Sequence, residues 1–328
     1  MCVNMFQSHK TISCSNHIAV ITSEGRVVCW GDNSCGQHNV PTDLENVTEI
    51  SSGRYHTAAI TSEGKVVCWG CNICGQCNVP ADLKTVIAIS CGRYNTVALT
   101  SDGQVVCWGD NSHGQCNVPT DLEKVVAVTC GWGLTVVITE KGRVVCWGVI
   151  RYGQYNVPLD FETVVMVNKN NIYNDYVASL TTNGKVVCWG NNDLGQCNVP
   201  ADLENVISIW CGYNNSMALT AEGCIVCWGD DSHDQCNVPP GLFINGCCKS
   251  DHNVALTTEG KVVCWGLNEH GQCDVPPDLE NVISICCGYN YTAAITAEGR
   301  VVCWGGNGCG QCDVPDGLVA HTNMVVLM

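Results

Sequence analysis

Four cysteines in the sequence stand three residues apart, a spacing found in metal sites. Cys68, Cys71, Cys74 and Cys77 form a C-x2-C-x2-C-x2-C run, and thiolates at such intervals ligate zinc or iron–sulfur clusters. Cys68 and Cys77, however, stand at positions that are also cysteine elsewhere in the chain, so that only Cys71 and Cys74 are additions. We therefore predict no metal and no cofactor, and keep these four residues as the one candidate metal set.

The remaining cysteines follow a pattern of their own. The chain contains 28 cysteines among 328 residues, and most recur at three fixed positions: before a repeated tryptophan, after a glutamine, and at the end of an apolar segment. The start of the sequence shows no basic and apolar leader, so we expect a reducing intracellular compartment, cytoplasmic or nuclear. There the cysteines would be buried thiols that fill recurring slots. A lattice of disulfides is the alternative.

The other reactive residues do not form a catalytic pattern. No serine or cysteine nucleophile pairs with a histidine and an orienting acid beyond what repetition alone produces, and no phosphate-binding glycine loop is present. His17, His56 and His252 occupy or flank one repeated position, which indicates core residues that form hydrogen bonds. The sequence predicts that the protein is not an enzyme.

The charge and hydropathy of the chain further narrow the classes of protein to which it can belong. Lys and Arg number 15 against 31 Asp and Glu, which gives a net charge of −16, and 46% of the residues are hydrophobic. This balance excludes a disordered chain, and the acidic excess argues against direct nucleic-acid binding. No apolar run approaches the roughly 18 residues of a membrane span, so we expect no membrane contact. A protein partner with a basic patch suits the negative charge better.

One unit of about 40 residues repeats eight times. Its marker tryptophans are Trp30, Trp69, Trp108, Trp147, Trp189, Trp228, Trp265 and Trp304. In one regular copy the segments 86–91, 96–100, 105–108 and 116–118 predict four strands, A to D, which is typical of a propeller blade. We predict an all-β fold with one domain over residues 1–328. We expect a single closed β-propeller of four-stranded blades with eight repeat units, which leaves seven or eight blades open, and residues 316–328 are a candidate ring-closing strand.

The repeat resembles that of the regulator of chromosome condensation family. The resemblance is carried by 55–61 (YHTAAIT), 64–70 (GKVVCWG) and 75–80 (GQCNVP), and it extends over essentially the whole chain. It looks most similar to the compact branch that includes a bacterial β-lactamase inhibitory propeller. The family usually has seven blades, whereas eight units are present here. Its nucleotide-exchange members act through an inserted wedge, and no insertion here exceeds three residues.

The loops between strands A and B differ from copy to copy and carry aromatic residues and arginines. In antiparallel blades they share one face with the C–D loops, which bring acidic residues. Tyr, Trp and Arg are enriched at binding hot spots, so we expect a partner-binding face there; an aromatic plug in the mouth of the ring is the alternative. The candidate residues are Arg54, Tyr55, Arg93, Tyr94, Trp132, Tyr173, Tyr213, Tyr289, Tyr291, Asp110 and Asp230.

These features together predict a monomeric, non-enzymatic scaffold that binds a protein partner through this face. Three alternatives remain open at this point. The first is a guanine-nucleotide exchange factor or chromatin-associated regulator, as the family resemblance implies. The second is a proteinaceous enzyme inhibitor, and the third is a structural component of an assembled particle.

Overall fold

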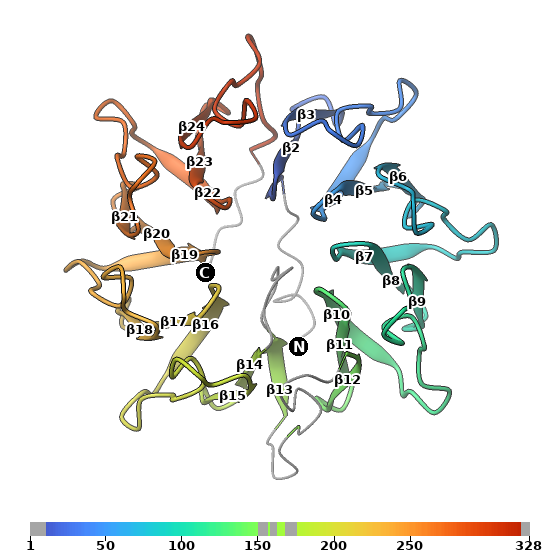
Figure 1. Cartoon of the computed structure of the whole chain (residues 1–328), viewed down its shortest axis with the longest axis horizontal. Coiled ribbons are helices and arrows are strands. Elements are labelled where there is room, and N and C mark those ends of the chain that lie inside the picture. The colour runs from blue at the N-terminus through green and yellow to red at the C-terminus, as the bar shows by residue number, and fades with distance from the viewer. Residues whose placement is uncertain (1–10, 150–156, 158–162, 168–175, 323–328) are drawn as a thin grey trace.

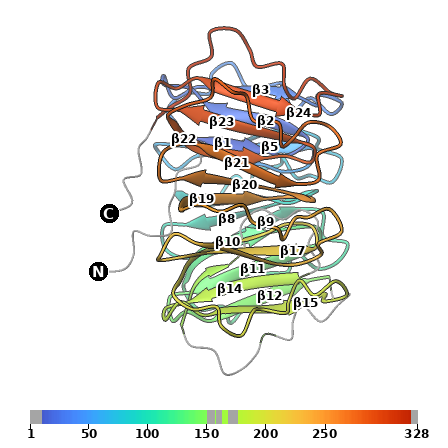
Figure 2. The same ribbon diagram turned by 90° about the vertical axis from the view of Figure 1, so that its left-hand side faces the viewer.

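The computed structural model of the chain describes residues 11–149, 157, 163–167 and 176–322. Within these residues the chain forms eight three-stranded antiparallel sheets, which are arranged around a common centre in Figure 1. Figure 2 shows the same ring from its edge, with the strands running between its two faces. The prediction of an all-β propeller with eight repeats is thus confirmed. No helix in this part of the chain is long and apolar enough to cross a membrane.

Each sheet contributes one strand to an inner, a middle and an outer layer. The inner strands are β1 (Ile12–Cys14), β4 (Val47–Ser52), β7 (Val86–Cys91), β10 (Val125–Cys130), β13 (Val164–Val167), β16 (Val206–Cys211), β19 (Phe243–Cys248) and β22 (Val282–Cys287). The middle strands are β2 (His17–Ile21), β5 (His56–Thr61), β8 (Asn95–Thr100), β11 (Leu134–Thr139), β14 (Tyr176–Thr181), β17 (Asn215–Thr220), β20 (His252–Thr257) and β23 (Tyr291–Thr296). The outer strands are β3 (Val27–Gly31), β6 (Val66–Gly70), β9 (Val105–Gly109), β12 (Val144–Gly148), β15 (Val186–Gly190), β18 (Ile225–Gly229), β21 (Val262–Gly266) and β24 (Val301–Gly305).

The middle strands are buried along their whole length except for the last residue of β5 and of β20, because neighbouring sheets cover their faces. All six residues of β8, for example, are buried, which explains why the middle segments are nearly continuous in apolar and small residues rather than alternating. The turn from middle to outer strand requires a left-handed residue: Gly64 has φ of +74°, and its N–H donates to the carbonyl oxygen of Thr61 (2.8 Å). A side chain would strain this conformation.

The predicted fourth strand is not formed, so the prediction of four-stranded blades is wrong for the described sheets. Residues 116–118 lie in a local turn, where the N–H of Asn117 donates to Gly114 (3.0 Å) and that of Val118 donates to Cys116 (3.0 Å). Pro119 follows and has no N–H to donate. Because the turn uses these donors itself, the segment adds no strand to the sheet β7-β8-β9.

The tryptophan of the outer strand ties most sheets to the preceding repeat, whereas the buried indole Nε1 of Trp304 has no hydrogen-bond partner among the described residues. The indole Nε1 of Trp108 donates to the backbone oxygen of Gln76 (2.9 Å), and the hydroxyl of Thr96 donates to the same oxygen (3.0 Å). A buried carbonyl left without these donors would cost free energy. The same indole bond joins Trp30 to Gln311, Trp69 to Gln37, Trp147 to Gln115, Trp228 to Gln196 and Trp265 to Gln235.

The first and last repeats are neighbours in the same way as any other two. The bond from Trp30 to Gln311 (2.9 Å) joins residues at opposite ends of the chain. Ile18 and Trp30 of the first repeat also pack in one buried cluster with Ile295 and Val301 of the last. The hydrophobic core therefore continues across this junction.

Residues near the C-terminus contact both ends of the ring. Ala320 makes an isolated antiparallel bridge to Thr22, and Val319 makes one to Arg300. The predicted ring-closing segment, 316–328, includes these bridges, whereas its residues 323–328 lie outside the described part.

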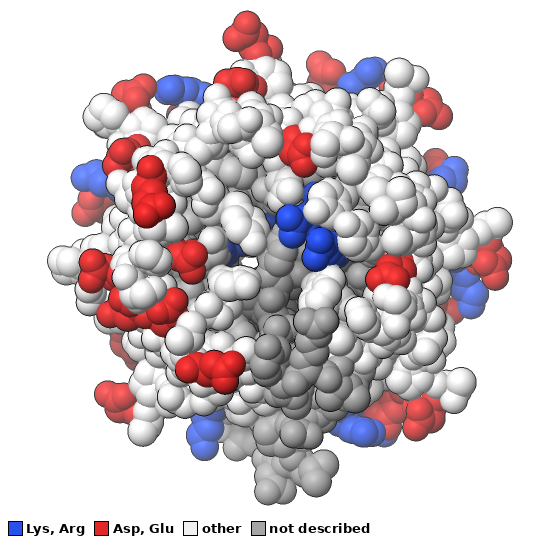
Figure 3. All heavy atoms as spheres, in the orientation of Figure 1, with Lys and Arg blue, Asp and Glu red and all other residues white. Residues whose placement is uncertain are grey.

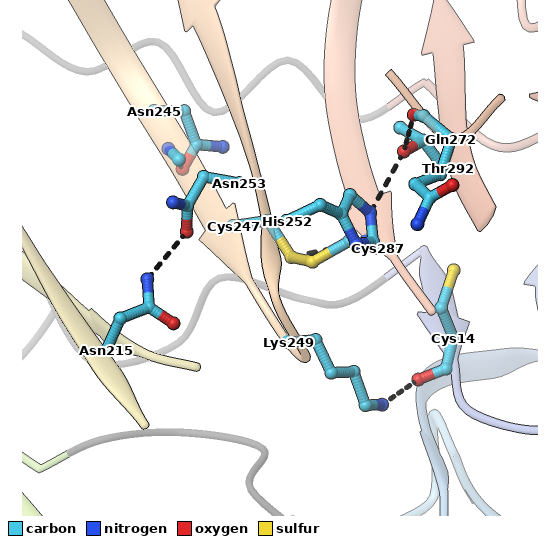
Figure 4. The surroundings of a disulfide bond; sticks show 11 residues. Cys14, Asn215, Asn245, Cys247, Lys249, His252, Asn253, Gln272, Cys287 and Thr292 are labelled. Atoms are coloured by element: carbon cyan, nitrogen blue, oxygen red, sulfur yellow. Dashed lines mark hydrogen bonds between the residues drawn. A yellow bond between two sulfur atoms is a disulfide. The ribbon is translucent and has the colours of Figure 1, made fainter. Parts of the chain in front are cut away.

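One disulfide corrects the expectation that all the cysteines remain thiols. It joins Cys247 of β19 to Cys287 of β22, with Cα atoms 6.2 Å apart, and so links two neighbouring inner strands (Figure 4). The other cysteines of the described residues are thiols, and those that end inner strands, such as Cys91 and Cys130, are buried as predicted.

Buried histidines form a second type of contact between repeats. His56 is fully buried, and its Nε2 lies 2.9 Å from the hydroxyl of Thr96 in the next repeat. His17 with Thr57, and His252 with Thr292, repeat the contact at 2.6 and 3.2 Å. The prediction that these histidines are core residues is confirmed. Burial lowers the pKa of His17 to about 3 and that of His56 and His252 to about 4.

We predict that His56→Asn reduces the loss of stability in acid. Between pH 6.5 and about 4 the unfolded chain binds a proton at His56 that the folded protein excludes, so stability falls as the pH falls. Removing one such group should lower the slope of unfolding free energy against pH by up to about 1.4 kcal/mol per pH unit. Asn95 and Asn215 occupy the same strand position in their repeats, so the variant should fold. Urea unfolding at pH 7, 6 and 5 measures both proteins, and an unchanged slope would show that His56 is not the titrating group.

Candidate partner-binding face

The A–B and C–D loops of each repeat lie on the same side of the ring, as predicted. The N–H of Cys71, just after strand β6, donates to the carbonyl oxygen of Tyr55 in the A–B loop (2.8 Å), and Asp110 donates in the same way to Tyr94 (2.8 Å). We call this surface the loop face. The B–C turns lie at the other ends of the strands, where Gly64 accepts a bond from the next inner strand.

Two neighbouring A–B loops form a compact group on the loop face, which we call the Arg–Tyr cluster: Arg54, Tyr55, Arg93 and Tyr94. The two tyrosine rings stack, with centroids 5.2 Å apart and planes 22° from parallel. Each arginine lies over the ring of the tyrosine that follows it, at 5.2 Å for Arg54 and 5.3 Å for Arg93. Stacked rings and cation–π contacts hold the four side chains in one arrangement.

The cluster also changes the ionisation of its members. Partial burial opposes the charge of Arg93, but hydrogen bonds from its guanidinium to the hydroxyls of Tyr94 and Tyr55 outweigh this and raise its pKa. Burial, together with the neighbouring Tyr55, raises the pKa of Tyr94. Both shifts favour a charged Arg93 beside a neutral Tyr94 at neutral pH.

The backbone under the cluster is fixed by close contacts between adjacent loops. The N–H of Arg54 donates to the carbonyl oxygen of Gly92 in the next repeat (3.4 Å). A Cβ atom at Gly53 would collide with the carbonyl oxygen of Gly92 in the next loop and with the ring of His56. Glycine at this position allows the loops to approach closely enough for Tyr55 and Tyr94 to stack.

Three further aromatic residues of the predicted set lie on the loop face. Trp132 is half-buried and meets the ring of His113 edge to face, with centroids 5.9 Å apart. Tyr213 and Tyr289 are 48% and 38% exposed, so both offer an aromatic surface that water now covers. Packing within the chain thus accounts for part of Trp132, and both tyrosines keep a substantial part of their surface exposed.

Tyr291 does not belong to this face, and its prediction as a binding residue is wrong. It is only 1% exposed, and its hydroxyl donates to the carbonyl oxygen of Ser15 (3.0 Å) in the first repeat. It begins β23, at the position that His56 holds in β5, so it is a core residue between repeats. Tyr173 lies outside the described residues.

The two acidic candidates are used within their own loops. Asp110 accepts bonds from the N–H of Ser112 (3.0 Å) and the side chain of Gln115 (2.9 Å). Asp230 accepts one from the N–H of Ser232 (3.1 Å). Both carboxylates are half-buried, so their first effect is to hold the C–D loops in shape.

Charges are unevenly distributed over the ring. In the view of Figure 3, Asp and Glu atoms are scattered over the surface out to its edge, where Lys and Arg atoms also lie, and a further small group of Lys and Arg atoms lies near the middle. The sequence predicted an aromatic centre with an acidic rim. With the Arg–Tyr cluster, the loop face has aromatic and cationic residues close together, inside a molecule whose net charge is −16.

The loop face has exposed aliphatic side chains that sequence reasoning missed. Ile73 is 80% exposed and Leu194 is 48% exposed, both on C–D loops. Both stand in the turn that leads to the Gly-Gln pair of the repeat. Leu194 directly precedes this pair, and Ile73 is separated from it by Cys74. An apolar residue inside such a turn was the available signal.

The four cysteines of the candidate metal set do not gather into a site. No group of three or more His, Cys, Asp or Glu side chains suited to a metal ion exists among the residues that the structure describes, which include all four. Cys71 is buried, Cys74 is exposed, and the thiol of Cys77 donates to the backbone oxygen of Cys71 (3.2 Å). This hydrogen bond stabilises the turn, which is a structural role for the Cys77 thiol rather than that of a metal ligand.

Comparison with protein families identifies the class of this chain. A model of the regulator of chromosome condensation (RCC1) repeat matches more than half of the sequence. The matched residues are 15–37, 47–76, 86–115, 125–154, 173–196, 206–235, 243–272 and 282–311. These eight segments coincide with the eight repeats, so the chain belongs to the RCC1-repeat family. Comparison with curated protein sequences found no match.

Solved structures of other propellers share the fold. Prp20p from Saccharomyces cerevisiae is 18% identical, with a TM-score of 0.59 over 74% of this chain and 77% of its own. Human WBSCR16 is 20% identical, with a TM-score of 0.60 over 83% and 90%. The ectodomain of the Arabidopsis thaliana receptor kinase ACR4 is 19% identical, with a TM-score of 0.60 over 80% and 96%. These matches support the family but not the narrower resemblance to a β-lactamase inhibitory propeller.

We predict that Asp110→Asn leaves stability within about 0.5 kcal/mol of the wild type, whereas Asp110→Ala lowers it by about 1 kcal/mol. The loop needs an acceptor rather than a charge, because Asn191 at the equivalent position accepts the same two bonds from Asp193 (2.8 Å) and Gln196 (3.1 Å). Urea unfolding measures the three proteins. Equal losses in both variants would show instead that the loop depends on the negative charge.

Proposed function

We propose that the protein is a non-enzymatic scaffold that binds another protein through the loop face. The observation that carries the proposal is the Arg–Tyr cluster. It combines the residue types most enriched at hot spots, and its side chains are already ordered by stacking, so that binding would cost little conformational entropy. Two exposed tyrosines, Tyr213 and Tyr289, extend the aromatic surface to other A–B loops.

The variation of the A–B loops supports the same proposal. The backbone ends of five described A–B loops are held by the same bond, as from Gly53 to His56 and from Gly92 to Asn95, whereas the side chains at their tips differ: Arg-Tyr at 54–55 and 93–94, Trp at 132, and Tyr-Asn at 213–214 and 289–290. If the side chains at these tips only had to hold the ring together, they could be the same in every repeat. A surface that recognises one particular partner needs different side chains at different places.

Charge suggests the kind of partner. A net charge of −16 favours approach of a protein with a basic surface and suppresses contact with nucleic acid. The two arginines of the cluster would then receive an acidic or aromatic side chain of that partner at the centre of the interface. We further propose that the interaction takes place in the cytoplasm or nucleus. The propeller itself would act as a monomer.

One narrower function follows from the structural relatives. The structure of Prp20p is described together with its binding to Gsp1p and to histones, and a histone is a basic partner of the kind that charge favours here. A chromatin-associated role is therefore a second proposal. Enzyme inhibition and a role in an assembled particle would use the same face. The identity of the partner distinguishes these two functions from a chromatin-associated role.

We predict that a variant with Tyr94→Ala, Trp132→Ala and Tyr213→Ala loses at least about tenfold in affinity for its partner. The wild type and the variant, both shown to be folded by circular dichroism, are used for affinity capture from lysate. The captured protein is then purified and titrated. Truncating three aromatic residues on the loop face removes contact area and two ring contacts between neighbouring loops, Tyr55 with Tyr94 and His113 with Trp132, but leaves the indole and histidine hydrogen bonds between repeats in place.

A matched control keeps this result specific. Leu242 is 56% exposed and lies next to a B–C turn, because the N–H of Phe243 donates to Gly223 (2.8 Å); Glu63 lies on another B–C turn. A variant with Leu242→Ala and Glu63→Ala should bind like the wild type. If this control loses the partner and the triple variant retains it, the binding face is the opposite one and the proposal is wrong.

A further inference from the structure

At four junctions between neighbouring inner strands, the strand ends meet in the same way. The side chain of the penultimate residue accepts a hydrogen bond from the N–H of the last residue in the next inner strand. The pairs are Ser13 with Ser52 (2.9 Å), Ser51 with Cys91 (3.0 Å), Ser90 with Cys130 (3.1 Å) and Cys247 with Cys287 (3.2 Å). We call such a pair an inner-strand pair.

The residue types of an inner-strand pair decide whether its two side chains form a disulfide. Ser90 and Cys130 meet through their side chains as well, with the thiol 3.6 Å from the hydroxyl. Where both members are cysteine, as in Cys247 and Cys287, the two sulfur atoms form the disulfide of Figure 4. The backbone geometry of this position therefore suits a disulfide without rearrangement.

A second pair with cysteine in both places stands where the two ends of the chain meet. Cys286 is the penultimate residue of β22, and Cys14 is the last residue of β1. Their strand positions match those of the first pair: Cys286 lies opposite Ala293 and Cys247 opposite Val254 in their own sheets. The two side chains are hydrogen-bonded to each other and belong to one packed cluster. Both are thiols in this structure.

We propose that Cys14 and Cys286 form a second disulfide between repeats, which covalently joins the first and last repeats of the ring. Cys14 is buried and Cys286 is half-buried, so Cys286 is the residue that an oxidant reaches first. The oxidant belongs to the class of small disulfides, such as oxidised glutathione.

The exchange then runs in two steps. The Cys286 thiolate attacks one sulfur of oxidised glutathione, forms a mixed disulfide and releases one glutathione thiolate. The Cys14 thiolate next attacks the Cys286 sulfur and expels the second glutathione. Two protein thiols thus lose two protons and two electrons, and one oxidised glutathione becomes two reduced molecules, each of which takes up one proton.

A buried lysine stands beside this pair. Lys249 follows β19 directly, and its ammonium donates to the carbonyl oxygen of Cys14 (Figure 4). Burial, followed by the contact with Cys286, raises the pKa of the Cys14 thiol, while the charge of Lys249 acts in the opposite direction. The lysine therefore favours the thiolate that the second step requires.

The experiment uses the full chain incubated with oxidised glutathione. Remaining thiols are blocked with N-ethylmaleimide, and the protein is digested without reduction and mapped by mass spectrometry. We expect a peptide cross-linked through Cys14 and Cys286, and a rise in Tm of about 5–10 °C, because the bond closes a very long loop. Dithiothreitol should remove both.

Two variants make the result specific. Cys286→Ser places at this position the residue that Ser51 and Ser90 supply in other repeats, and it should show neither the peptide nor the Tm rise. Cys91→Ser introduces the residue type that Ser52 supplies at the equivalent strand end. It removes a buried thiol from a pair whose other member is serine, and it should respond like the wild type. The proposal is wrong if the wild type gives the Cys247–Cys287 peptide but not the Cys14–Cys286 peptide, if either residue pairs with another cysteine, or if Cys286→Ser gains the same Tm.

Discussion

The structure depends on one hydrogen bond made again and again, from the tryptophan indole of one repeat to the glutamine carbonyl of the repeat before it. The acceptor is backbone and the donor is the largest side chain of the blade, so the bond sets both the distance and the tilt between sheets. It also explains why Gln is retained in the C–D turn: its side chain accepts the N–H of a residue two positions earlier, as Gln76 does from Cys74 (3.0 Å), and so holds its own carbonyl toward the next repeat. No repeat completes its hydrogen bonds alone.

This framework separates what must stay constant from what can vary. The bonds between repeats use the tryptophan, the glutamine and the first residues of the middle strand, all of which are buried. The tips of the A–B loops take no part in the indole and histidine bonds. They are held by backbone contacts at their ends, such as Cys71 to Tyr55, and in the Arg–Tyr cluster also by stacking between neighbouring tips. Different side chains can therefore occupy the tips without changing the ring, which is how the Arg–Tyr cluster arises on two neighbouring loops while a single tryptophan or tyrosine stands on others.

Much of the fold could be read from the sequence, because its period and its turn residues repeat eight times. The fourth strand could not, since the segment at Cys116–Pro119 has the apolar and β-branched character of a short strand, and only the local bonds of Asn117 and Val118 show a turn. Tyr291 was predicted wrongly because, like Tyr55, it closely follows a loop glycine. Tyr55 stands two residues after Gly53 and lies in the loop, whereas Tyr291 stands three residues after Gly288 and begins the buried strand β23. The disulfide was also out of reach: Cys247 and Cys287 belong to different repeats, and sequence alone does not show which strand ends face each other.

The junction between the last and first repeats has a topological meaning. Ala320 donates to Gly299 (2.9 Å) as Val86 donates to Gly64 (2.9 Å), and Trp30 reaches Gln311 as Trp69 reaches Gln37. At this level of contact the junction that holds the termini cannot be distinguished from an internal one. The ring is thus built from repeats that meet their neighbours largely through the same contacts, also where the first and last repeats meet. If a whole repeat were gained or lost, the repeats beside it would meet a new neighbour that still carries the tryptophan and glutamine of the shared pattern.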